Sequence, residues 1–131
     1  MTVMDFTGIY GRENFYRGKS TDWVDCRELM GTAFYCSEEA EAVLKEKIAG
    51  LPVRGIHFID SGNYHYMTKL WTDRIQEPFS LILMDHHTDT QPPVFPGMLS
   101  CGGWVKDILD QNPFIKSAVL LGMPEQGIGQ P

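Results

Sequence analysis

The stretch FSLILMDHHTD, residues 79 to 89, decides the expected fold because an apolar run passes directly into ionisable side chains. Residues 79 to 84 have the composition of a central strand in a parallel sheet, covered on both faces. Asp85, His87 and Asp89 follow at alternate positions. Buried carboxylates are costly unless they are paired or bound to a cation. This pattern therefore predicts a ligand site where a central strand ends.

Strand and helix patterns alternate on both sides of this stretch. We expect strands around 5–10 and 22–29, a helix between Ser37 and Gly50, a strand at 55–60, a helix at 65–76, a helix at 102–111 and a strand at 115–122. This order predicts right-handed crossovers and one α/β domain over residues 1–131. The expected architecture is a mainly parallel sheet between two layers of helices.

Charge and composition exclude several classes of protein. The formal net charge of -6, without a cluster of Lys and Arg, argues against nucleic-acid binding. No segment resembles a signal peptide or an apolar membrane span, so we expect a cytoplasmic protein without a membrane partner. Cys26, Cys36 and Cys101 show no metal-binding or disulfide spacing, which favours reduced structural thiols at Cys26 and Cys36.

The spacing of the cluster after residue 84 suits a divalent cation. Along extended backbone, Asp85, His87 and Asp89 point to one side, and His86 points to the other. Two carboxylates and an imidazole are suitable ligands for an ion such as manganese. His65, in the loop after the preceding strand, is placed to complete the set. The alternative is that these are polar loop residues that cap the next elements.

Two motifs in this chain resemble those of a known family. The segment GNYH at 62–65 is similar to the Gly-Gly-Asp-His motif of the arginase and agmatinase family, the ureohydrolases. The segment DHHTD at 85–89 resembles the Asp-Ala-His-x-Asp motif of the same family. The order and separation of the two motifs also fit, and the resemblance covers roughly residues 54–122.

The resemblance implies a three-layer α/β/α fold of the arginase and deacetylase type, a pair of manganese ions, and hydrolysis of non-peptide C–N bonds in guanidino, amidino or formimino compounds. By this resemblance His65 and Asp89 bind one ion, His87 binds the other, and Asp85 bridges the two. Asp85 and His87 thereby also act in catalysis. Gln91 lies where the family has a polar residue that contacts the small-molecule substrate.

The chain also departs from the family pattern. Cys101 stands near the position of the family's proton-shuttling histidine, where it is either a nucleophile at the start of a helix or a structural thiol. The second metal motif, Asp-x-Asp after a later strand, is absent from this sequence. We therefore expect the N-terminal half of a ureohydrolase-like fold, a truncated or split protein for which activity and inactivity of the isolated chain are both open. A complementing C-terminal half or a second copy would be its partner.

Three other readings remain open. Asp-His-His after an apolar strand is also found in the DHH phosphoesterases, which need an upstream Asp-x-Asp that 5–10 and 22–29 do not supply. Zinc-dependent deacetylases share Asp-x-His-His but continue with Gly-Asp-Gly, where this chain has Thr88, Asp89 and Thr90. The third reading is a metal-binding or interaction module without catalysis.

Overall fold

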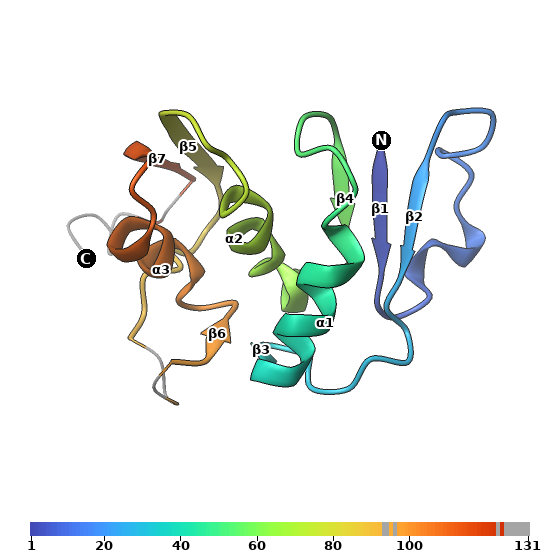
Figure 1. Cartoon of the computed structure of the whole chain (residues 1–131), viewed down its shortest axis with the longest axis horizontal. Helices are drawn as coiled ribbons and strands as arrows, with labels where there is room; N and C mark the ends of the chain where they lie inside the picture. The colour runs from blue at the N-terminus through green and yellow to red at the C-terminus, as the bar shows by residue number, and fades with distance from the viewer. Residues whose placement is uncertain (93–94, 96, 123, 125–131) are drawn as a thin grey trace.

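Strands and helices alternate along the computed structural model, which describes residues 1–92, 95, 97–122 and 124 (Figure 1). In chain order the elements are β1 (Thr2–Asp5), η1 (Ile9–Arg12), β2 (Asp22–Asp25), β3 (Tyr35–Cys36), α1 (Glu38–Ile48), β4 (His57–Ile59), η2 (Gly62–Tyr64), α2 (Met67–Thr72), β5 (Phe79–Met84), β6 (Leu99–Ser100), α3 (Trp104–Gln111) and β7 (Ile115–Leu121). The fold is thus a small mixed α/β domain.

The strands form short sheets that are mostly parallel. The first sheet has the order β2-β1-β4, and β1 is parallel to both neighbours. A second parallel sheet consists of β5 and β7, and the short strands β3 and β6 pair antiparallel. Among the described residues no strand joins β4 to β5. The expected parallel pairing is therefore present, but in two separate sheets.

Local signals located most of the elements correctly. The helix after Ser37 is confirmed, and the Ser37 hydroxyl accepts a hydrogen bond from the backbone N–H of Ala40 at 3.1 Å. The strands expected near residues 55, 79 and 115 are confirmed as β4, β5 and β7, and the helix at 102–111 as α3. The helix expected at 65–76 is shorter, because residues 65–66 and 73–74 form turns on either side of α2. The strand expected at 5–10 is instead β1, which begins at Thr2.

The expectation that β5 is covered on both faces is wrong for the described residues. Leu81 and Leu83 pack against the core, whereas Ile82 and Met84 on the opposite face are exposed. An apolar run identifies a strand that can be buried on both sides, but the covering layer must come from elsewhere in the polypeptide. Here the described segments supply that layer on one side only.

The helices and the inner faces of both sheets share one hydrophobic core. Its members include Met4 and Val24 from the first sheet, and the fully buried side chains Leu44, Leu70 and Ile108 from the three α-helices. Leu81 and Leu83 extend this core to β5. No helix among the described residues has both the length and the apolar character needed to cross a membrane.

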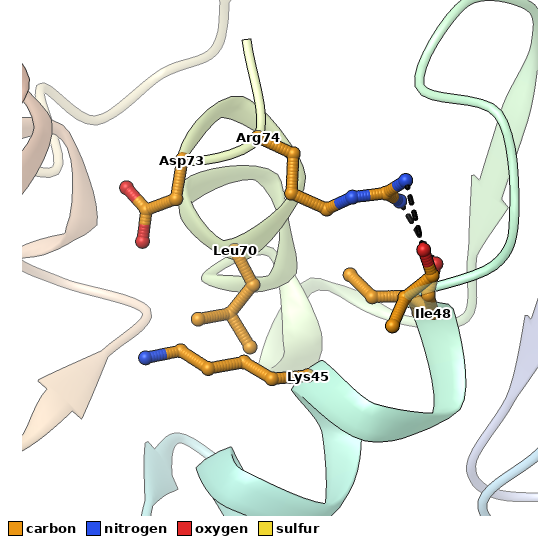
Figure 2. A pocket seen from close by; sticks show the side chains of 6 residues that line it. Lys45, Ile48, Leu70, Asp73 and Arg74 are labelled. Carbon is orange, nitrogen blue, oxygen red and sulfur yellow. Dashed lines mark hydrogen bonds between the residues drawn. The ribbon is translucent and has the colours of Figure 1, made fainter. Parts of the chain in front are cut away.

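A guanidinium group joins α1 to the segment after α2 (Figure 2). Arg74 donates hydrogen bonds to the carbonyl oxygens of Ile48 at 2.8 Å, Ala49 at 3.3 Å and Leu51 at 2.6 Å. These carbonyls lie at the C-terminal end of α1, where helix carbonyls lack partners within the helix. The positive charge also opposes the negative end of the helix dipole. Arg74 thus fixes the position of α1 relative to α2.

We predict that Arg74→Met lowers the free energy of unfolding by about 1–3 kcal/mol, because partly buried carbonyls lose their donors while the aliphatic stem remains. Urea unfolding measures the change. Arg54→Met is the matched control: Arg54 is almost fully exposed and lies 3.7 Å from Glu77. Its replacement is expected to change the unfolding free energy by less than about 0.5 kcal/mol. Equal effects for the two variants would contradict the role of Arg74.

Candidate metal centre

Three of the four predicted ligands come together at the carboxyl ends of β4 and β5. His65, Asp85 and Asp89 each offer a ligand atom, and these atoms lie within 4.8 Å of one another. The Nδ1 atom of His65 is 3.9 Å from Oδ2 of Asp85. His65 is exposed, Asp85 is half-buried and Asp89 is buried. The group therefore lies at the surface with one deep carboxylate.

The loop that carries His65 is held by a neighbouring aspartate. The Asp60 carboxylate, directly after β4, accepts hydrogen bonds from the backbone N–H groups of Phe6 at 2.8 Å, Thr7 at 2.9 Å and Ser61 at 2.7 Å. Asp60 also has a positive φ of 32°. This carboxylate thus joins the end of β4 to the end of β1. It fixes the start of the turn that ends at His65.

Asp85 is positioned by the last strand. Its backbone N–H donates to the carbonyl oxygen of Leu121 at 2.9 Å, which extends the pairing of β5 with β7 by one residue. Gly122 follows with a φ of 92°, and a Cβ atom there would lie 3.1 Å from the carbonyl oxygen of Asp85. A side chain at position 122 would therefore strain the backbone and press on Asp85.

Asp89 is bound to the start of α3 through both its backbone and its side chain. Its carbonyl oxygen accepts from the backbone N–H groups of Val105 at 3.0 Å and Lys106 at 3.4 Å. Its Oδ2 atom accepts from the indole Nε1 of Trp104 at 2.9 Å. Asp89 has a φ of 54°, in the left-handed region that few side chains adopt. These hydrogen bonds offset the strain, and they leave Oδ1 of Asp89 without a hydrogen bond to the indole.

The two carboxylates are in different electrostatic environments. Burial acts to raise the pKa of Asp85, but the backbone N–H groups of His87 and His86 and the nearby imidazoles outweigh it, so this pKa is lowered. Burial raises the pKa of Asp89, the Trp104 hydrogen bond opposes the rise, and the charge of Asp85 adds to it. Asp85 is therefore ready as an anionic ligand, and Asp89 would gain most from a nearby cation.

His87 lies beside the group but is not one of the three. Its Nδ1 is 3.5 Å from Oδ1 of Asp85, its backbone N–H donates to the same oxygen at 3.1 Å, and its side chain is exposed. The expected alternation along 85–89 does not form, because the chain leaves the strand at Met84 and bends. Asp85 and Asp89 converge through the left-handed backbone of Asp89 instead.

Gln91 and Cys101 both lie in the segment between β5 and α3. The backbone N–H of Gln91 donates to the carbonyl of Gly102 at 2.8 Å, and the side chain is exposed. Burial raises the pKa of the Cys101 thiol, so at neutral pH this thiol is protonated. A protonated thiol favours the structural role over the nucleophilic one. The role of Gln91 in substrate binding stays a prediction.

Trp104 is the site residue that sequence reasoning missed. It is fully buried at the first position of α3, and its apolar ring alone would be explained by packing. The segment GGW carries one indirect signal, since a Cβ atom on Gly103 would lie 2.7 Å from the carbonyl oxygen of Gln91. The glycine permits the close approach that brings the indole to Asp89.

The donor set fits a divalent cation. One imidazole and two carboxylates are ligands that manganese, zinc and iron accept. Three protein ligands leave coordination positions for water or a substrate, as in catalytic metal sites. The three residues also come from two loops that strands and helices hold in place, which limits the rearrangement that binding would require.

Comparisons with known proteins give little further information. No protein-family model matches the chain, and no solved structure matches it significantly. An uncharacterized protein of Thermotoga maritima is 28% identical over 129 residues, which is 95% of this chain and 49% of that protein. The chain thus spans about half the length of this relative.

We predict a strong coupling between Trp104 and Asp89 in chelator-treated protein. A double-mutant cycle of Trp104→Phe and Asp89→Ala is expected to give a coupling energy of about 1.5–3 kcal/mol, because the indole N–H donates to a buried charged group. Urea unfolding of the four proteins measures it. The control cycle replaces Trp104→Phe by Trp71→Phe, since the Trp71 indole donates to the Met4 sulfur. A cycle additive to within about 0.5 kcal/mol would contradict the assignment.

Proposed function

We propose that this chain carries the metal site of a hydrolase that cleaves non-peptide C–N bonds in guanidino, amidino or formimino compounds. The single observation that supports the proposal is the convergence of His65, Asp85 and Asp89 within 4.8 Å. The two motifs that resemble those of the ureohydrolases contain these residues. The complete three-layer arginase-like architecture and a cytoplasmic location belong to the same proposal.

The residues would divide the ligand roles as the resemblance implies. His65 and Asp89 would hold one manganese ion, His87 would hold a second, and Asp85 would bridge them. The two oxygens of the Asp85 carboxylate support this division, because Oδ2 faces His65 at 3.9 Å and Oδ1 faces His87 at 3.5 Å. A bound ion of this kind would supply water of lowered pKa and polarise the substrate.

The surrounding groups would orient the ligands. Trp104 holds one oxygen of Asp89, so the other oxygen is directed to the ion. The backbone N–H of His87 holds Oδ1 of Asp85 and keeps this carboxylate ionised. A positioned acid must also protonate the leaving amine. Because His87 would be a metal ligand in this scheme, the proton would come from another group, and the protonated thiol of Cys101 is the candidate.

The remaining ligands would come from outside this sequence. The described residues offer three clustered ligands and His87, and the chain spans about half of its Thermotoga maritima relative. We propose that a complementing half supplies further carboxylates at the exposed side of His65. The chain alone would then bind metal weakly and turn over slowly, and the joined halves would be active.

We predict that manganese raises the melting temperature of the purified chain. Binding to the folded state alone stabilises it by RT ln(1 + [L]/Kd), or about 2.7 kcal/mol at a hundredfold excess over Kd. Scans with and without manganese, after chelator treatment, measure the shift. His65→Ala, Asp85→Ala and Asp89→Ala are each expected to abolish it.

His86→Ala is the matched control, because His86 adjoins the ligands but its exposed side chain is outside the group. It should retain the full manganese shift. His87→Ala distinguishes one ion from two: a binuclear site loses half of the bound manganese, and a mononuclear site loses none. A wild-type chain without any shift would rule out the metal site.

Activity is tested by release of urea or ammonia from guanidino and formimino compounds, with phosphate esters as the comparison. Cleavage of phosphate esters alone would favour the DHH phosphoesterase. Metal binding without either activity, also after addition of the complementing half, would favour a non-catalytic metal-binding module. The Asp85→Ala variant serves as the blank in each assay.

A further inference from the structure

The sheet of β5 and β7 has one packed face and one bare face. Across the strands Ile82 pairs with Val119 and Met84 with Leu121. These four side chains, which we call the bare face, are exposed by 64%, 46%, 80% and 48% respectively. On the other side of the same strand, Leu81 and Leu83 pack against the core. The bare face is therefore a continuous aliphatic surface that no described residue covers.

In the first sheet, by contrast, another segment of the chain covers the apolar side chains. All four residues of β1 are buried. Val3 lies in register with Trp23 on one side and Phe58 on the other. The rings of Tyr10 and Phe15 contact these aromatic residues, with centroid distances of 6.1 Å for Tyr10 and Trp23 and 4.5 Å for Phe15 and Phe58. The segment around η1 thus covers the first sheet.

No described segment does the same for β5 and β7, which lie at the opposite end of the molecule from β1 and β2 (Figure 1). Parallel sheets in α/β proteins are buried on both faces, because crossover helices lie on both sides. A two-stranded sheet has little stability unless other elements pack against it. Contiguous exposed aliphatic surface of this kind indicates an interaction.

We propose that the bare face binds a helix of a polypeptide equivalent to the part of the Thermotoga maritima relative that this chain does not match. That part is about as long as this chain, since the matched residues make up 49% of the relative. The bare face is aliphatic and carries no charge, so its complement is the apolar stripe of an amphipathic helix. Ser80 and Ser117, hydrogen-bonded to each other at 2.9 Å, mark its polar border.

The bare face lies next to the candidate metal centre, but the proposed docking does not depend on metal binding. Met84 directly precedes Asp85, so a polypeptide docked on the bare face would lie close to the ligand group. The docking itself uses only aliphatic contacts. The docking proposal therefore holds even if the chain binds no metal.

The test mixes the purified chain with a separately expressed polypeptide, the unmatched part of the Thermotoga maritima protein. Size-exclusion chromatography with light scattering is expected to show a one-to-one complex. Hydrogen exchange should slow in residues 79–84 and 115–121. Ile82→Lys and Val119→Lys are each expected to weaken the complex by about tenfold or more, because a charge would be buried among apolar groups.

Leu109→Lys is the matched control, since Leu109 is an equally exposed aliphatic residue on α3. It should leave the affinity unchanged, and far-UV circular dichroism checks that all variants are folded. A homodimer that Ile82→Lys disrupts would overturn the proposal in favour of a second copy as the occupant. Absence of a complex, or a complex that both lysine variants leave intact, would also overturn it.

Discussion

The attachment of Asp89 to the start of α3 is the constraint on which the candidate metal centre depends. The backbone of Asp89 adopts a left-handed conformation, which Asp tolerates better than most residues but which still costs energy, and two backbone amides and an indole offset the cost. Without this bend, Asp89 would continue away from Asp85 along extended backbone. The site is thus a product of packing between a loop and a helix that follows it, and the strand contributes only Asp85.

Both carboxylates of the candidate site have surroundings that suit a cation ligand. Asp85 is kept ionised by backbone donors, and Asp89 is kept in place by a donor although burial disfavours its charge. A bound cation would offset the cost of the buried charge on Asp89, and it would bind the carboxylate of Asp85, which is already ionised. His65 approaches from a separate loop that Asp60 fixes to β1. Each of the three candidate ligands is therefore held in place by a different part of the fold.

Sequence reasoning succeeded where the determinants are local. The Ser37 cap and the apolar period of α1, and the β-branched and apolar runs of β5 and β7, locate elements without knowledge of their neighbours. The rule that ligands lie beyond the carboxyl ends of parallel strands placed His65 near Asp85. The position of Trp104 could not be predicted, because it depends on the left-handed backbone conformation of Asp89, which no local pattern in the sequence signals. The bare face could not be predicted either, since coverage of a strand is a property of the rest of the polypeptide.

The pairing of Asp85 with Leu121 has a consequence for how the site is assembled during synthesis. Asp85 receives its backbone partner from the last strand, and Asp89 receives its partners from the helix just before that strand. All ligands leave the ribosome before either support exists. A nascent chain therefore presents the imidazole and carboxylates as a loose set, and the candidate ligands converge only after β7 has paired with β5 and the start of α3 has bound Asp89.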